Sequence, residues 1–145
     1  MQSFETVQFL AYVDRDLLER RATDLFDHMA AHDLDKALKL FAPQASVTLG
    51  QDLRAMPFYG RHQGLSAIRK VLRDVHIEYE VLRQDIQDVM LDGDRAVLRR
   101  LCRLRHRGTG KVCNITFCDW LRFEEGLIIS LESVGDTMAL AELVS

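Results

Sequence analysis

Asp119 is the residue of this 145-residue sequence best placed to do chemistry. It lies in residues 111–123, whose alternating apolar and polar residues predict a β-strand. Its neighbours on the same predicted face are Ile115, Phe117, Leu121 and Phe123. An ionised carboxylate on such an apolar face loses its water, which is costly unless something compensates for the loss. Either a partner neutralises Asp119, or its carboxyl group is protonated, or it faces a lined cavity, and each arrangement makes it a functional candidate.

Arg100 is the predicted partner of this acid. A turn at Gly108-Thr109 joins residues 95–106 to the strand of Asp119, and the resulting hairpin places Arg100 opposite Phe117. Arg100 and Asp119 are then diagonal neighbours on one face, about 7–8 Å apart at the backbone. If they pair, the acid stays ionised and the pair is structural or binds an anion. If Arg100 points away, burial makes Asp119 a hydrogen-bond donor or general acid.

The two faces of this hairpin differ in character. One face, with Leu98, Cys102 and Ile115 beside the acid, is the more apolar and should meet the helices. A shift of the register by one residue would destroy that agreement between the strands. Trp120 lies on the other face, and an exposed aromatic there predicts a homodimer through the outer sheet surface.

The elements that position these residues follow in the order helices first, strands later. Helical spacing predicts helices over 14–31, 34–41 and 65–75, with a short strand over 45–49. Alternation then predicts a series of antiparallel strands over 79–91, 95–106, 111–123 and 127–134, followed by a short helix capped by Asp136. This is an α+β pattern in a single domain, residues 1–145. A curved sheet wrapped over helices leaves a cavity between them, where a ligand is expected.

Composition and charge exclude several other classes. The net charge of −3 argues against a nucleic-acid partner, which requires a basic field. No signal peptide or membrane-spanning run is apparent, and three cysteines without a Cys-x-x-Cys pair indicate free thiols, so we expect a cytoplasmic protein without membrane contact. His28 and His32 have a metal-binding spacing but no third ligand, which predicts no metal. No glycine-rich phosphate loop is present, and no cofactor is expected.

Three segments resemble the NTF2-like superfamily, and within it the SnoaL-like polyketide cyclases and the ketosteroid isomerases. They are residues 31–47, residues 58–68, and residues 119–128 followed by 136–140. The resemblance implies an α+β cone of helices packed on a curved sheet that encloses a pocket. Asp119 matches the isomerases' protonated pocket aspartate and the motif aspartate of the cyclases. The isomerases' catalytic base falls at Leu49, and the second carboxylate of the family's epoxide hydrolases falls at Ser133.

The resulting hypothesis is a small-molecule pocket protein, with cofactor-independent acid/base chemistry of the cyclase, isomerase or dehydratase type on a mostly hydrophobic substrate. The alternative is a non-catalytic ligand-binding, accessory or scaffolding protein. The proposed catalytic residues are Asp119, as acid or base, with Arg100 and Tyr59 as polar helpers. The proposed pocket residues are Phe26, Met29, Met56, Phe58, Phe117 and His106.

Overall fold

The computed structural model describes residues 4–50 and 59–145, with side chains described from residue 15 onward. The helices in this part of the chain are α1 (Phe4–Ala30), α2 (Leu34–Leu38), α3 (Leu65–Glu78) and α4 (Thr137–Val144). The strands are β1 (Phe41–Leu49), β2 (Gly60–Gln63), β3 (Tyr79–Asp92), β4 (Arg95–His106), β5 (Val112–Glu124) and β6 (Leu127–Gly135). None of the described helices is both long and apolar enough to span a membrane.

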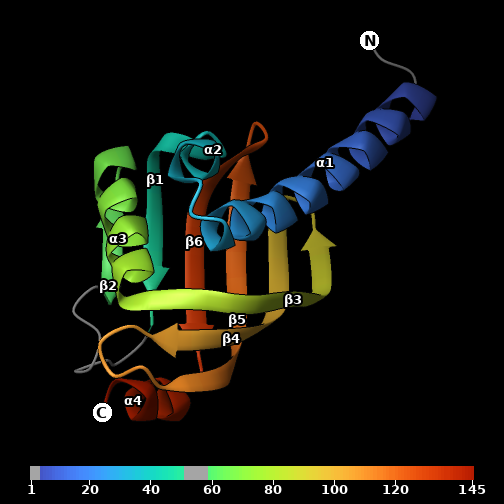
Figure 1. Ribbon diagram of the computed structural model, residues 1–145. Helices are drawn as coiled ribbons and strands as arrows, with labels where there is room; N and C mark the ends of the chain where they lie inside the picture. Colours follow the sequence, from blue (N-terminus) through green and yellow to red (C-terminus); the bar gives the residue numbers. More distant parts are fainter. Residues whose placement is uncertain (1–3, 51–58) are drawn as a thin grey trace.

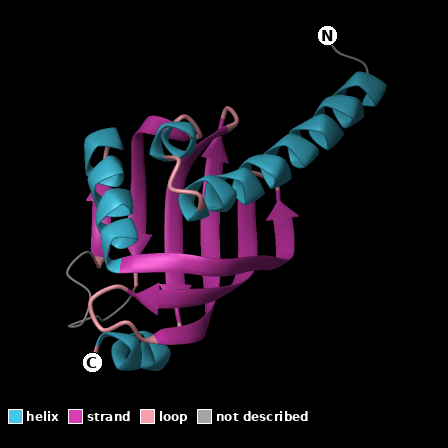
Figure 2. Ribbon diagram, in the orientation of Figure 1, coloured by secondary structure: helices cyan, strands magenta, loops and turns pink. Residues whose placement is uncertain are grey.

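The strands form one sheet in the order β2-β1-β6-β5-β4-β3. All neighbouring strands are antiparallel except β1 and β6, which run parallel. Figure 1 shows that the long strands β3 and β4 bend away from β1 and β6, so that the sheet curls around its inner face. Helices α1 and α3 cover that inner face, and α4 lies at the end of the sheet beside the turn between β4 and β5 (Figure 2). The predicted α+β cone is confirmed.

The hairpin of β4 and β5 has the predicted register. Leu98 lies opposite Asp119, Arg100 opposite Phe117, and Cys102 opposite Ile115. Burial alternates along β4, and Leu98, Arg100 and Cys102 are all buried on the inner face. The apolar face therefore packs under the helices, where it joins a core that includes Leu25, Phe26, Ile115 and Leu131.

Three element boundaries differ from the prediction. Helix α1 begins at Phe4 instead of residue 14, α2 ends at Leu38, and β1 begins at Phe41 instead of residue 45. Strand β1 therefore contains Pro43, which sequence rules place at a bulge because proline cannot donate a ladder hydrogen bond. The pairing of β1 with β6 is indeed irregular between Phe41 and Ser46. Strand β3 also has two irregularities in its pairing with β4, between Val81 and Arg83 and between Ile86 and Asp88.

Candidate functional site

Asp119 and Arg100 form a buried, two-pronged ion pair on the inner face of the sheet. The Nε of Arg100 donates to Oδ2 of Asp119 at 2.5 Å, and its Nη2 donates to Oδ1 at 3.0 Å. The Asp119 side chain is fully buried, and that of Arg100 is 9% exposed. A fork of this kind is the strong, geometrically specific form of arginine–carboxylate contact. Of the two arrangements left open by the sequence, the structure has the paired one.

Ser133 completes the surroundings of the carboxylate. Strands β5 and β6 pair so that Ser133 lies directly opposite Asp119, and its hydroxyl donates to Oδ1 at 2.6 Å. The carboxylate thus accepts three hydrogen bonds from two side chains, as an acceptor-only ionised acid can. Asp119 is held in place by these contacts, and both of its oxygens are already engaged.

The guanidinium group of Arg100 lies over two aromatic rings. Its Cζ lies 4.0 Å from the centroid of Phe26 in α1 and 4.8 Å from that of Phe117 in β5. Such cation–π contacts stabilise a desolvated cation by up to about 2 kcal/mol. The Nη1 atom donates to Oε1 of Gln84 at 3.1 Å and lies 3.7 Å from the Cys102 sulfur. Only the outer edge of the guanidinium is left to meet a ligand.

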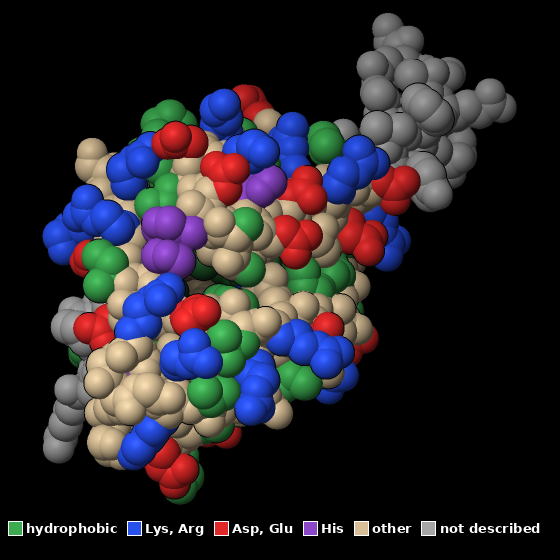
Figure 3. All heavy atoms as spheres, in the orientation of Figure 1, with side chains coloured by type: hydrophobic (Ala, Val, Ile, Leu, Met, Phe, Trp, Pro, Cys, Tyr) green, Lys and Arg blue, Asp and Glu red, His purple; other side chains and the backbone are tan. Residues whose placement is uncertain are grey.

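That edge borders a cavity of about 120 Å³ between the sheet and the ends of α1 and α3. Its described polar lining residues are Tyr79, Gln84, Arg100, Cys102 and Ser133. Its apolar and small lining residues are Met29, Ala30, Leu49, Gly50, Leu72, Val75, Val81, Leu104, Phe117, Gly135 and Leu140. In Figure 3 hydrophobic side chains lie in a recess whose rim carries charged residues and histidines. The described lining does not include Asp119, which lies behind Arg100 and Ser133.

The other protonatable groups of the lining are neutral near pH 7. Burial raises the pKa of the Tyr79 hydroxyl to about 12, and nearby Glu78 acts in the same direction. Burial likewise raises the pKa of the Cys102 thiol, so this sulfur is held as a thiol, not as the nucleophilic thiolate. Among the described lining residues Arg100 is therefore the one formal charge.

His106 is a structural residue outside the described lining of the cavity. Its Nε2 lies 2.9 Å from Oε2 of Glu78, and the backbone N–H of Thr109 donates to its Nδ1 at 3.2 Å. The Thr109 hydroxyl donates to the carbonyl of Leu143 in α4, so it is not activated by the imidazole. His106 thus joins the end of β4 to the following turn, and that turn holds α4.

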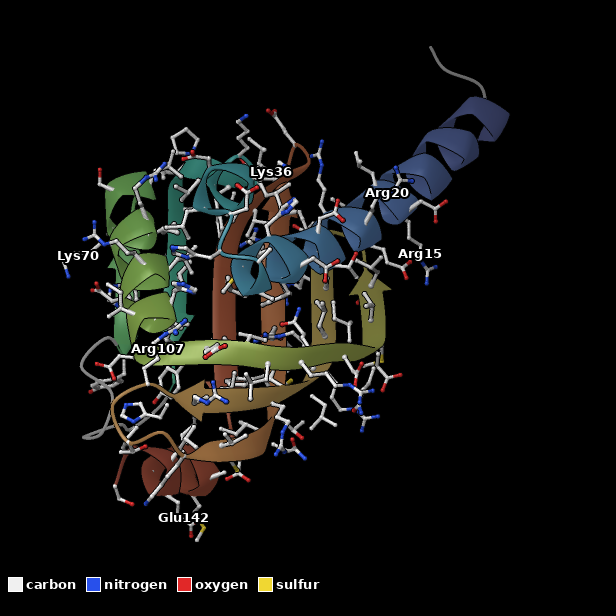
Figure 4. The ribbon with its side chains drawn as sticks, in the orientation of Figure 1. Arg15, Arg20, Lys36, Lys70, Arg107 and Glu142 are labelled. Atoms are coloured by element: carbon white, nitrogen blue, oxygen red, sulfur yellow. The ribbon has the colours of Figure 1, made fainter. Side chains whose placement is uncertain are left out.

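Neighbouring contacts fix the same end of the domain. Figure 4 shows Arg107 where α3 meets β3, and its Nε donates to the carbonyl of His76 at 3.1 Å. His32 stacks its ring on that of His76, with centroids 3.4 Å apart. Within residues 15–50 and 59–145 no three side chains of metal-binding type come together.

The remaining residues named from the sequence fall in three places. Met29 and Phe117 line the cavity, and Phe26 packs against Arg100 without appearing in the lining. Tyr59 is 49% exposed and lies outside the described lining. Met56 and Phe58 lie outside the described residues. Gln84 was not identified from the sequence, because the irregularities of β3 on both sides of it obscure which face each residue occupies.

Gly135 gives Phe117 the room to lie over Arg100. A methyl group on Gly135 would come within 2.7 Å of Cε1 of Phe117 and 3.1 Å of Cδ1 of Leu140. We expect Gly135→Ala to lower the free energy of unfolding by about 1–3 kcal/mol, as overpacking does. Guanidinium denaturation measures this loss. Thr116→Ala, at an exposed residue of β5, is the control, and an equal loss in that variant would contradict the explanation.

The comparisons with known proteins identify the family. The SnoaL-like domain family matches residues 22–131, well over half of the chain. The chain therefore belongs to the SnoaL-like domain family, and it is a pocket protein of the NTF2-like superfamily. No curated protein matches it.

Solved structures with the same fold are numerous. An NTF2-like protein of unknown function from Burkholderia pseudomallei K96243 has a TM-score of 0.82 at 19% identity, covering 89% of this chain and 98% of its own. A putative isomerase from Rhodopseudomonas palustris has a TM-score of 0.76 at 22% identity, covering 88% and 94%. TerC, co-crystallised with polyporic acid, has a TM-score of 0.78 at 16% identity, covering 88% and 98%. At these identities the likeness shows the fold alone.

Proposed function

We propose that this protein binds a small, largely apolar molecule in the cavity, with an oxygen atom of that molecule against the edge of Arg100. The observation that carries the proposal is a mostly apolar cavity with a single guanidinium at one side. Binding sites generally combine an apolar lining with a few convergent polar groups that orient the ligand. A dry, enclosed cavity of roughly 150 Å³ accepts benzene. This cavity of about 120 Å³ is open to the surface, so it suits a single-ring molecule that is not wholly enclosed.

We assign different roles to the two charged residues. Arg100 is the group that would contact the ligand, because it lines the cavity and Asp119 does not. Asp119 and Ser133 are positioning residues, since their hydrogen bonds hold the guanidinium in one orientation. TerC, which shares the fold, was crystallised with polyporic acid, and this supports a small organic molecule as the ligand here.

Acetophenone, a single ring with one oxygen, is a suitable probe for this proposal. Titration of methyl-labelled protein should shift the methyl signals of Leu72, Val75 and Leu140, which line the cavity, and leave the exposed Ile77 unchanged. The double variant Arg100→Met/Asp119→Leu removes the donors together with the charge pair, and should bind several-fold more weakly. Shifts confined to exposed methyl groups would contradict the proposal.

A second candidate function is isomerase-type chemistry without a cofactor. The observation that favours it is the fixed arginine donor beside the ligand space, because donors aimed at a developing oxyanion stabilise the transition state of enolisation. In that reaction the α-proton passes to water and the electron pair moves to the carbonyl oxygen beside Arg100. Exchange of the acetophenone methyl protons in D₂O should then be faster with the wild-type protein than with Arg100→Met/Asp119→Leu. Equal rates would leave binding as the function.

We also propose that the protein is a homodimer that associates through the outer face of the sheet. Trp120 is 55% exposed on that face. The nearby charges are largely paired within the face, as in Arg99–Asp88 at 2.9 Å and Arg122–Asp94 at 3.4 Å. A large aromatic among locally balanced charges suits contact with an identical surface.

Substitution of Trp120 tests this association directly. We expect Trp120→Glu to convert the dimer to a monomer in sedimentation equilibrium, because each copy would place a new carboxylate at the interface. Met138→Glu, at a still more exposed apolar residue of α4, is the control and should leave the mass unchanged. A wild-type protein that sediments as a monomer at high micromolar concentration would overturn the proposal.

A further inference from the structure

We propose that the ligand of this cavity is electrically neutral and presents one acceptor oxygen, as a ketone, aldehyde or ester carbonyl does. This inference rests on the proposed binding function and narrows it to one chemical class. It comes from the hydrogen bonds and the charge balance around Arg100.

The first argument is a count of donors. A guanidinium has five N–H groups in a fixed plane. Two of them, on Nε and Nη2, form the fork to Asp119. Two more, on Nη1, face Gln84 at 3.1 Å and the Cys102 sulfur at 3.7 Å. Among the described residues no acceptor is found for the second N–H of Nη2, so Arg100 offers a ligand one strong donor.

A single donor selects against carboxylates. Arginine recognises a carboxylate best through two parallel N–H···O bonds. Asp119 occupies one such fork, and Gln84 takes one prong of the other. The Ser133 hydroxyl donates its proton to Asp119, so it can only accept from a ligand. One carbonyl oxygen can be satisfied by the remaining N–H, whereas two carboxylate oxygens cannot.

The second argument is the charge balance. The positive charge of Arg100 is already compensated by Asp119 at 2.5 Å, and both side chains are buried. An anionic ligand would add a negative charge to a neutral pair in a desolvated site. None of the other described lining residues is basic, so this charge would lack a partner. Burying an unpaired charge is far more costly than burying a carbonyl group that accepts one hydrogen bond.

Acetophenone and benzoate form a matched pair of probes, because both are single rings and only benzoate is charged at pH 7.5. In calorimetric or methyl-shift titrations of the wild-type protein, acetophenone should bind at least tenfold more tightly than benzoate. Ethylbenzene, which lacks the acceptor, should fall several-fold below acetophenone. These three measurements use the protein as it is and need no variant.

Asp119→Asn should shift the preference towards the anion. The substitution keeps the shape of the side chain but leaves Arg100 with an uncompensated charge, which benzoate can then neutralise. We expect the ratio of benzoate to acetophenone affinity to rise at least tenfold. Asp35→Asn is the matched control, because it removes an equal charge from an exposed arginine pair, Asp35–Arg69 at 2.7 Å. Its ratio should equal that of the wild type.

The possible outcomes distinguish failure of the neutral-ligand inference from failure of the proposed binding function. If the wild-type protein binds benzoate as tightly as acetophenone in the cavity, the neutral-ligand inference is wrong and the binding function stands. If none of the probes shifts the cavity methyl groups, the binding function fails and the inference fails with it. If Asp119→Asn does not fold, as judged by circular dichroism, the wild-type comparison alone decides.

Discussion

Asp119→Ala is expected to lower the free energy of unfolding by about 3–5 kcal/mol, the usual cost of breaking a buried ion pair by removing one partner. The variant leaves the Arg100 cation buried among Phe26 and Phe117 without its counter-charge. It also leaves the Ser133 hydroxyl without the acceptor it now has at 2.6 Å. Equilibrium denaturation in guanidinium, followed by far-ultraviolet circular dichroism, measures this loss.

Two further variants test whether the loss of stability comes from leaving Arg100 buried without a partner or would follow the removal of any carboxylate. Asp35→Ala removes an exposed partner of Arg69 and should unfold at nearly the wild-type guanidinium concentration, since water solvates the remaining arginine. The double variant Arg100→Met/Asp119→Leu replaces the whole pair with apolar side chains and should recover most of the loss. A double variant as unstable as Asp119→Ala would mean that the pair itself, not the orphaned cation, stabilises the fold.

Phe26→Ala should be about as destabilising, with an expected loss of about 3–5 kcal/mol. Phe26 is fully buried, and its ring covers one face of the Arg100 guanidinium at 4.0 Å. Truncation removes apolar burial, leaves a void and exposes the cation to whatever fills that void. The same denaturation experiment measures the change. Phe123→Ala provides a comparison at another buried phenylalanine, near the end of β5.

Phe26→Leu isolates the contribution of the aromatic face. Leucine fills much of the same space but cannot make a cation–π contact, which at a desolvated site is worth up to about 2 kcal/mol. We therefore expect Phe26→Leu to fall between the wild type and Phe26→Ala. If it is as stable as the wild-type protein, the ring acts by packing alone and the cation–π contact adds nothing measurable.

The hairpin that carries the candidate site could be predicted from the sequence because the apolar residues of both strands have to lie on the same face. Period-two alternation in residues 95–106 and 111–123 is consistent with burial only in one register. That register brings Arg100 within reach of Asp119, and the structure confirms it. The long start of α1 and the entry of β1 before Pro43 could not be predicted, since the first depends on weak local patterning and the second on a bulge against β6.

The depth of each side chain within the site was beyond sequence reasoning. Alternation shows which face a residue occupies, but not how far its side chain extends from that face. An aspartate carboxylate lies close to its strand, whereas an arginine reaches several bonds further. Arg100 therefore lies between Asp119 and the cavity, and Asp119 supports the residue that lines the cavity. The same limit applies to Tyr59, because the sequence around it has no alternating pattern that would predict the direction of its side chain.

The parallel pairing of β1 with β6 has a consequence for how the protein is made. Strand β1 is made well before its partner β6, yet the two strands lie side by side, with Ser46 beside Ser130. Contacts between such distant segments form slowly, because a long loop must close before they contribute. Ser133 belongs to β6 as well, so the carboxylate of Asp119 gains its third hydrogen bond only after that strand has been made. Until then the site cannot be complete, and partly folded chains of this kind are the species that misfold and that chaperones bind.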